Sequence, residues 1–281
     1  MSNGVTTTDF TLDGHAGRLV GTSWTPRNPR WIAVIAHDYG EHVGRFRWTA
    51  ARLHEAGAAV HAADHEGHGR SDGARALIRD AEAAVEDLDR VIDHAVAENP
   101  GLPVVLIGVS MGGMLSARCT QRFGARLTAL VLLSPVLGRW ETIEELLPLP
   151  EIPETPIDPK LLSRDPEVAA AYAADPLVWH GGFARPTLQA LRDELQRISI
   201  AGRLGRVPVL HLHGEDDRLV PVEDAVAGLA KIAGPATESQ LYPGARHELL
   251  HETNRAEVMA DLLAFLGRFV PVGTGGTGEA D

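Results

Sequence analysis

The stretch VVLIGVSMGGMLSARCTQRF, residues 104–123, decides the fold. It begins with an apolar, β-branched run of strand length, continues into a pattern typical of a helix, and places Gly108-Val109-Ser110-Met111-Gly112 between the two. The two glycines permit a sharp strand-to-helix turn, because a side chain at either position would clash with neighbouring backbone. The stretch therefore predicts that Ser110 projects from the end of a buried strand as a nucleophile, with an ordinary glycine-rich turn as the alternative.

Similar apolar runs recur along the chain, at residues 31–36, 58–64, 127–135 and 207–214. Amphipathic stretches lie between them, and residues 80–99 show the clearest helical spacing of apolar side chains. Strand–helix alternation of this kind predicts right-handed crossovers and a mostly parallel sheet covered by helices on both faces. Before these runs, polar and apolar residues alternate on both sides of Asp13-Gly14, which predicts a leading antiparallel hairpin.

The alternation breaks between residues 136 and 206, where five prolines crowd one segment and short helical patterns follow. We interpret 136–206 as a cap inserted into a core made of 1–135 and 207–270, and 271–281 as a disordered tail. A packed subdomain without a cap's role is the alternative. The apolar residues that we expect to be exposed, as would suit a cap over an apolar site, are Leu146, Leu147, Leu149, Ile152 and Leu162.

Composition limits the classes of partner. The chain is 44% hydrophobic and 23% charged, which fits a soluble globular protein, and its formal net charge of -12 argues against nucleic acid or an anionic membrane surface as the main partner. Its single cysteine, Cys119, excludes an internal disulfide. The first residues lack the features of a signal peptide, and no apolar run is long enough to span a bilayer, so we expect a cytoplasmic location, with surface association left open.

A serine nucleophile needs a base and an acid that orients the base. HLHGEDDRLVP places Asp217 just after a predicted strand, and QLYPGARHELLHE places His247 after another, in the order Ser, Asp, His that α/β-hydrolases use. Asp216 is assigned to the turn, and His251 is a secondary candidate for the base because it lies where a helix is expected to start. A surface-loop role is the alternative for His247.

Stabilisation of the oxyanion requires backbone N–H groups near the nucleophile. We expect Met111 to donate one from the helix start and Tyr39 to donate another from WIAVIAHDYGEHVGRF. Asp38 stands in this loop where a glycine is usual. A carboxylate aimed at the oxyanion would oppose catalysis, so we predict that the side chain of Asp38 points away.

The segment 63–73 and its neighbour His61 suggest a second kind of site. His61, Asp64, His65 and His68 cluster in sequence, but their spacing matches zinc sites poorly and the glycines around them favour a tight structural turn. We expect no metal and no cofactor.

The segments HDYGEHVGR, DHEGHGRSDG, GVSMGG, LLSP, HGEDDRLVP and YPGARHE together resemble the monoacylglycerol lipase group of α/β-hydrolases, the bacterial and actinobacterial members above all. The resemblance covers roughly residues 10–269 and is much more specific than the serine motif alone. It implies an eight-stranded, mostly parallel sheet, a mobile cap, and hydrolysis of monoacylglycerol to glycerol and fatty acid without a cofactor. By the same resemblance, Glu41 and Arg45 help to place the glycerol head group, with a structural salt bridge as the alternative.

The sequence thus predicts a serine ester hydrolase whose partner is a lipid ester, with transient contact to a membrane or micelle through the cap. A lysophospholipase, general carboxylesterase or thioesterase with the same three residues is the first alternative. A catalytically silent binding protein, with its oxyanion site spoiled by Asp38, is the second. A dehalogenase or epoxide hydrolase would need an acid in place of Ser110. The sequence leaves the oligomeric state open.

Overall fold

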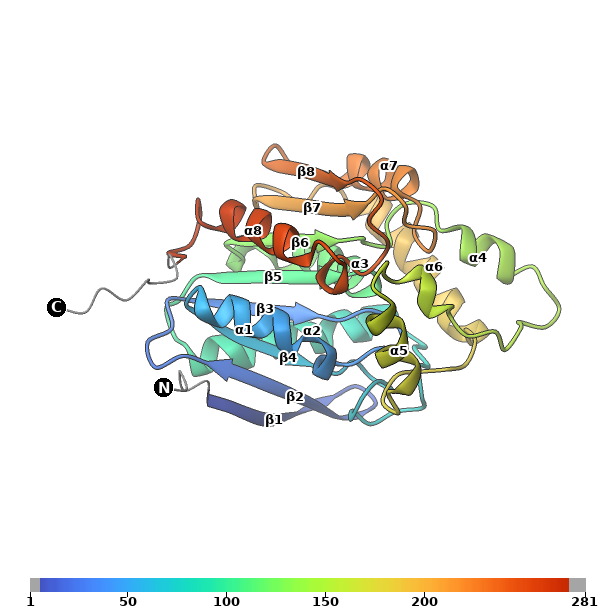
Figure 1. Cartoon of the computed structure of the whole chain (residues 1–281), viewed down its shortest axis with the longest axis horizontal. Coiled ribbons are helices and arrows are strands. Elements are labelled where there is room, and N and C mark those ends of the chain that lie inside the picture. Colours follow the sequence, from blue (N-terminus) through green and yellow to red (C-terminus); the bar gives the residue numbers. More distant parts are fainter. Residues whose placement is uncertain (1–5, 273–281) are drawn as a thin grey trace.

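A computed structural model describes residues 6–272 and shows one eight-stranded sheet in the order β1-β2-β4-β3-β5-β6-β7-β8. The pairs β1–β2 and β2–β4 are antiparallel and all other neighbours are parallel, which confirms the mostly parallel sheet (Figure 1). The strands are β1 Thr6–Gly14, β2 Gly17–Thr25, β3 Trp31–Ala36, β4 Ala58–Ala63, β5 Val104–Val109, β6 Ala129–Leu133, β7 Val209–Gly214 and β8 Thr237–Tyr242.

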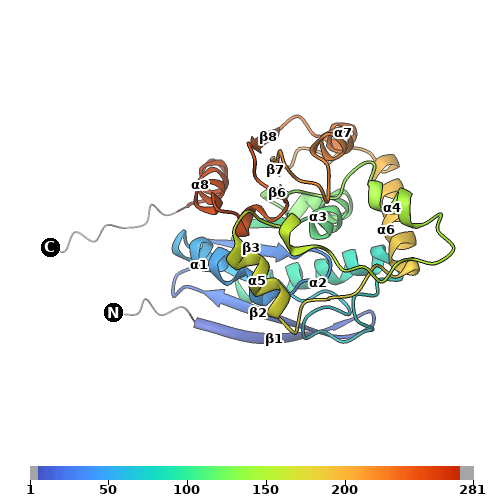
Figure 2. The ribbon, with the colours of Figure 1, turned by 45° about the vertical axis from the view of Figure 1, so that its right-hand side comes forward.

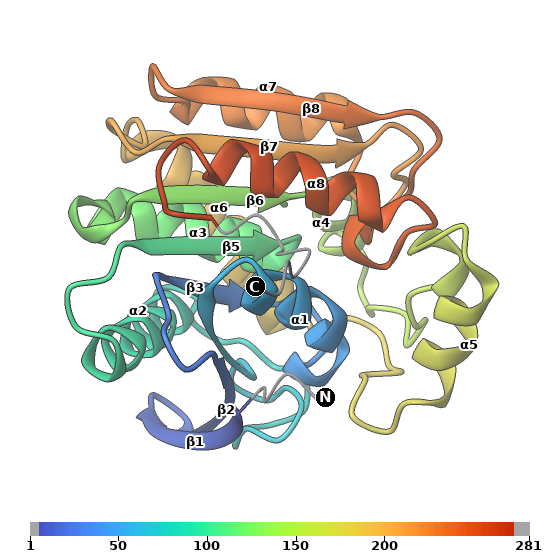
Figure 3. The same cartoon turned by 60° about the vertical axis from the view of Figure 1, so that its left-hand side comes forward.

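Helices cover both faces of the sheet (Figures 2 and 3). The helices α1 and α8 bury their apolar sides against one face, and α2, α3 and α7 against the other. The strands β3 to β7 are buried along their whole length because they lie between these layers. The helices are α1 Arg47–Glu55, α2 Ala81–Glu98, α3 Met111–Phe123, α4 Glu141–Leu146, α5 Pro166–Ala174, α6 Arg185–Ile200, α7 Val222–Ile232 and α8 Arg255–Leu266, with 3-10 turns η1 Val43–Phe46, η2 Gly124–Arg126, η3 Pro159–Leu161 and η4 Leu249–His251.

The leading hairpin forms, but its turn lies two residues beyond the predicted position. Gly14 pairs with Gly17, so His15 and Ala16 make the turn and Asp13-Gly14 ends β1. Gly17 adopts φ 125°, a conformation that favours glycine, whereas Gly14 does not have a positive φ. The left-handed residue that closes the turn is therefore the second glycine, not the first.

Residues 136–206 connect β6 to β7 and contain α4, η3, α5 and α6. The helices α4 and α5 lie beyond the carboxyl edge of the parallel strands (Figure 1), whereas α6 packs against α2 and α3. The expected exposed character holds for Leu149, which is 38% exposed, but Leu162 is buried. Leu162 packs with Tyr172 and Val178 in a small apolar cluster of its own.

None of the helices in residues 6–272 combines the length and apolar character that crossing a membrane would need. The predicted tail falls mostly on residues 273–281, which lie outside the described part of the chain.

Candidate active site

Ser110 occupies the turn between β5 and α3, with φ 52° and ψ -114°. A positive φ is uncommon for a residue other than glycine and costs of order 1–3 kcal/mol. Three backbone hydrogen bonds hold it: Ser110 N donates to Leu133 O at 2.9 Å, and Ser110 O accepts from Met114 N and Val136 N, each at 3.1 Å. The surrounding backbone thus fixes the serine in the projecting conformation predicted from its motif.

The glycines that flank Ser110 are required by close backbone approach. A Cβ on Gly108 would lie 2.5 Å from Gly112 O, and a Cβ on Gly112 would lie 2.2 Å from Ala36 O. Neither carbonyl has room to retreat, because each belongs to the packed junction of sheet and helix. The motif therefore forms a sharp turn in which the start of α3 lies against the end of β3. An ordinary glycine-rich turn would not explain why both glycines are in such close contact with backbone.

Asp217 and His247 come from the ends of β7 and β8 and meet through a hydrogen bond. Asp217 Oδ2 lies 2.7 Å from His247 Nδ1, and both residues are buried. Asp217 Oδ1 accepts from Leu219 N at 2.9 Å and from Val220 N at 3.0 Å. The carboxylate is thereby fixed, and it leaves Nε2 of His247 as the nitrogen free to act on another group.

Their electrostatics reinforce the pair. Burial opposes the ionised form of Asp217, but the charge of His247 and hydrogen bonds from His213 and His247 outweigh it and lower the pKa of Asp217 well below its usual range. Burial also opposes protonation of His247, but Asp217, followed by Asp38 and Glu248, raises the pKa of His247 to about 9. An imidazole in this setting holds a proton strongly once it has taken one.

Two residues that support this pair were not identified from the sequence. His213 Nε2 lies 3.2 Å from Asp217 Oδ2. Ser134, at φ 43°, donates its hydroxyl to His247 O at 2.8 Å. The available signal was that Ser134 directly follows a buried strand and precedes Pro135, and that His213 is polar within a wholly buried strand.

One narrow cavity of about 40 Å³ is lined by Ser110 and His247 together, and Tyr39 and Met111 line it too. The structure therefore brings the predicted nucleophile, the predicted base and both predicted oxyanion donors to one place. The segment 136–206 contributes further lining residues: Val136, Trp140, Thr142, Ile157, Leu162, Tyr172 and Phe183.

The loop that carries Tyr39 is held by two buried histidines. His65 N donates to His37 Nε2 at 2.9 Å, so His37 carries its proton on Nδ1, which lies 2.8 Å from Asp38 O. His65 Nε2 lies 3.0 Å from His37 O and donates to it. Tyr39 is anchored by its own hydroxyl, which donates to Ala76 O at 3.0 Å. These bonds leave the backbone of Tyr39 in a fixed orientation at the cavity wall.

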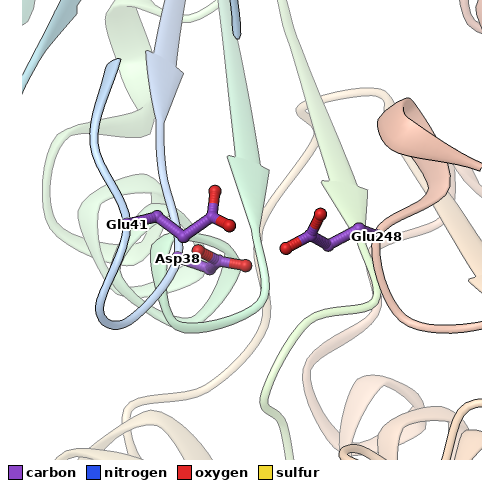
Figure 4. Close-up of side chains that lie close together, drawn as sticks. All are labelled: Asp38, Glu41 and Glu248. Atoms are coloured by element: carbon purple, nitrogen blue, oxygen red, sulfur yellow. The ribbon is translucent and has the colours of Figure 1, made fainter. Parts of the chain in front are cut away.

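The orientation of Asp38 differs from the prediction. Its side chain does not turn away from the site: Asp38 lines the cavity with Ser110 and His247, and its carboxylate lies beside those of Glu41 and Glu248 (Figure 4). Carboxylate oxygens of these three acids lie within 4.8 Å of one another. Burial, followed by the negative charge of Glu248, raises the pKa of Asp38 above its usual range.

Arg45 pairs with two of these acids. Its guanidinium forms an ion pair with Glu41 and a two-pronged one with Glu248, at 3.1 Å and 2.8 Å. Burial favours the neutral form of Glu248, but Arg45 and then His251 lower the pKa of Glu248. The salt bridge that was the alternative for Glu41 and Arg45 is thus present, with Glu41 in the cavity wall and Arg45 behind it.

The remaining sequence candidates take structural positions. His251 lies in η4 and its Nε2 donates to Arg45 O at 3.0 Å, while its Nδ1 is 3.2 Å from Glu248. Asp216 is partly exposed and approaches Arg218. In the histidine-rich segment, Asp64 accepts from the N–H groups of Val43 and Arg70, as a structural turn requires; His61 bonds to Ser23 and Asn99, and His68 Nδ1 to Glu66 O.

Comparison with known proteins agrees with this geometry. The family model described as serine aminopeptidase, S33 matches residues 27–254. A monoacylglycerol lipase of Mycolicibacterium smegmatis is 35% identical over 89% of this chain and 92% of that protein, and a human monoglyceride lipase is 31% identical over 82% and 79%. The crystal structure of a Paleococcus ferrophilus monoacylglycerol lipase covers 89% of this chain and 99% of that one, with 25% identity and a TM-score of 0.77. The chain belongs to the serine aminopeptidase S33 family of serine hydrolases, with the α/β-hydrolase fold.

Proposed function

We propose that this protein hydrolyses monoacylglycerol to glycerol and a free fatty acid, with Ser110 as nucleophile, His247 as base and Asp217 as the acid that orients the base. The observation that carries the proposal is the shared cavity of Ser110 and His247, with the second nitrogen of that imidazole bound to Asp217. The substrate class is suggested by the relatives named as monoacylglycerol lipases, which match over most of the chain.

In the first half of the cycle, His247 Nε2 takes the proton of Ser110 Oγ while that oxygen attacks the ester carbonyl carbon. The oxyanion that forms accepts hydrogen bonds from the N–H groups of Tyr39 and Met111. The carbon–oxygen bond to glycerol then breaks, and His247 returns its proton to the departing glycerol oxygen. Ser110 is left acylated.

In the second half, His247 takes a proton from water as the water oxygen attacks the acyl carbon. Breakage of the bond to Ser110 Oγ releases the fatty acid, and the proton goes back to Ser110. The positive charge that His247 carries in both halves is stabilised by the ionised Asp217, whose pKa lies far below neutral.

The small volume of the cavity limits access. Its volume of about 40 Å³ holds roughly three water molecules, too little for an acyl chain. We infer that the segment 136–206 acts as a cap that shifts to admit lipid, because Trp140, Leu162, Tyr172 and Phe183 line the same narrow cavity as Ser110.

The cap also offers apolar side chains to a lipid surface. Leu149 is 38% exposed, next to the partly buried Leu146 and Leu147. We propose that this end of the cap contacts micelles or membranes during substrate uptake. Replacing Leu149 with Glu should raise KM for a micellar monoacylglycerol and leave KM for a short, monomeric one unchanged; an equal effect on both would contradict the contact.

The main test uses purified protein with a long-chain monoacylglycerol, and measures glycerol and fatty acid in equal amounts. A fluorophosphonate probe should label Ser110 stoichiometrically, and Ser110→Ala should abolish both labelling and release. Full activity in Ser110→Ala would overturn the proposed nucleophile, and absence of labelling would favour a silent binding protein.

A further inference from the structure

We propose that the acids beside Ser110 form a head-group subsite that accepts an uncharged polyol and rejects anionic, phosphate-bearing leaving groups. The inference rests on the proposed function, because it concerns the alcohol released from the ester. It assigns the discrimination between neutral and anionic head groups to Asp38. This residue adds a carboxylate to the loop of Tyr39 at a position where a glycine is usual. The enzyme would then act on monoacylglycerols in preference to lysophospholipids of the same acyl chain.

The first argument is charge. Asp38, Glu41 and Glu248 bring three carboxylates within 4.8 Å of one another, and they are only 4%, 1% and 2% exposed. All three line the cavity of Ser110, and Figure 4 shows their carboxylates turned toward one another. Arg45 pairs with Glu41 and Glu248, and the imidazole of His251 also contacts Glu248. When the neighbouring imidazoles are neutral, three carboxylates face one guanidinium and leave a net negative wall. A second anion placed beside such a wall, in a site with little water, meets strong repulsion.

The second argument is that Arg45 is not offered to a ligand. Its guanidinium is held by Glu41 and Glu248 and lies 4.9 Å from the centre of the Tyr172 ring, which covers it from the cap side. The side chain of Arg45 is only 8% exposed. A phosphate would have to break both ion pairs to reach this cation, and it would still face the carboxylates that those pairs had neutralised.

The third argument is a free acceptor. Within residues 6–272, Oδ1 of Asp38 has no hydrogen-bond partner although it is buried. A buried acceptor without a donor is unfavourable, and a hydroxyl group is the donor that would satisfy it at no cost in charge. Glycerol carries two free hydroxyls when esterified once, so a bound monoacylglycerol can donate to Asp38 next to the reacting carbonyl.

The test compares esters that share an octanoyl chain, so that acyl binding is constant: 1-octanoylglycerol, 1-octanoylglycerol 3-phosphate and 1-octanoyl-glycerophosphoglycerol. The measured quantity is the ratio of kcat/KM for the neutral ester to kcat/KM for each anionic ester, taken on the alkaline plateau of each variant. Wild-type protein should prefer the neutral ester by about 100-fold or more. Asp38→Asn and Asp38→Gly should each reduce that ratio at least about tenfold.

The two substitutions also separate charge from hydrogen bonding. Asparagine keeps an acceptor oxygen but loses the charge that strengthens its hydrogen bond, so KM for 1-octanoylglycerol should rise less than in the glycine variant. Glycine removes both, so that KM should rise. Glu145→Gln serves as a matched control, because Glu145 is an exposed acid on α4 and its loss changes the net charge equally; its ratio should equal the wild-type ratio.

Three results would overturn the inference while the proposed function stands. The kcat/KM ratio could be unchanged by both Asp38 substitutions, or it could shift in Glu145→Gln as much as in the Asp38 variants. The third result is activity on the anionic esters that Ca²⁺ raises and EDTA removes, but only in protein that retains Asp38. The last would mean that the acids hold a cation. Failure of the proposed function looks different, because none of the octanoyl esters would be cleaved although p-nitrophenyl butyrate is. Fluorophosphonate labelling and thermal unfolding show that each variant is folded.

Discussion

His213 Nε2 lies 3.2 Å from Oδ2 of Asp217, and both side chains are wholly buried. The same nitrogen lies 2.9 Å from Val220 O, which can only accept, so Nε2 carries a proton. Nδ1 of His213 is then the acceptor that faces His211 Nε2 at 3.1 Å. Asp217 therefore has an imidazole on each side, one from His247 and one from His213, and the second belongs to a buried histidine pair.

We predict that His213→Phe lowers kcat for a soluble ester roughly 10- to 100-fold with little change in KM. A hydrogen bond to a charged group contributes about 1.5–3 kcal/mol, and here it holds the carboxylate that stabilises protonated His247. His213→Gln, whose amide can still donate, should recover part of the loss. Equal losses of folded protein and of activity in both variants would mean that His213 serves packing alone.

Asp217→Asn should lower kcat by about 10⁴-fold, because an amide offers His247 Nδ1 the wrong partner and cannot stabilise the imidazolium. Stopped and continuous assays with p-nitrophenyl butyrate cover this range. Asp216→Asn is the matched control, since Asp216 is partly exposed and faces Arg218; its kcat should stay within about threefold of wild type. A larger effect at Asp216 than at Asp217 would exchange their assigned roles.

How far the sequence predicts this site depends on the range of each interaction. The Ser110 elbow was predictable because the strand, both glycines and the helix are contiguous, and Asp217 and His247 followed from their places after strands. The direction of the Asp38 side chain was not, because the sequence does not show that Glu41 and Glu248 share its wall, Glu248 coming from the loop after the edge strand β8. His213 stood out as a polar residue of a buried strand, but its contact with Asp217 was not predictable, because that contact depends on the packing of the 217–220 turn.

We predict that Arg45→Gln lowers the free energy of unfolding by about 3–5 kcal/mol near neutral pH, because it leaves buried carboxylates without their cation. In the wild-type protein the lowered pKa of Glu248 stabilises the folded state. This stabilisation is fully present above about pH 4.5, the pKa of Glu248 in the unfolded chain, and is lost as the pH falls through the lower pKa of Glu248 in the folded protein. Without Arg45, burial is the dominant influence on the pKa of Glu248 and raises it, so the free energy of unfolding should instead fall as the pH rises.

Urea unfolding at pH 4 and pH 8 measures this difference, which should be larger at pH 8. Arg52→Gln provides the comparison, because Arg52 pairs with Glu55 at the surface, where both side chains are about half exposed. Its cost should not exceed about 1 kcal/mol and should vary little with pH. A loss in Arg45→Gln that is equally small would show that the buried pair contributes no more than a surface one.

The pH dependence of kcat/KM should have its acidic limb displaced above the ordinary histidine range, because kcat/KM reports the free enzyme and its base must be neutral. Asp217, together with Asp38 and Glu248, raises the pKa of His247 to about 9, so activity should rise with pH until that value is passed.

Asp38 is ionised on this limb even though burial raises its own pKa. Removing its charge in Asp38→Asn favours the neutral imidazole and should move the limb to lower pH, whereas Glu145→Gln should leave it in place. A limb near 6.5 in wild type, unmoved by Asp38→Asn, would mean that the acids around His247 do not act on its proton.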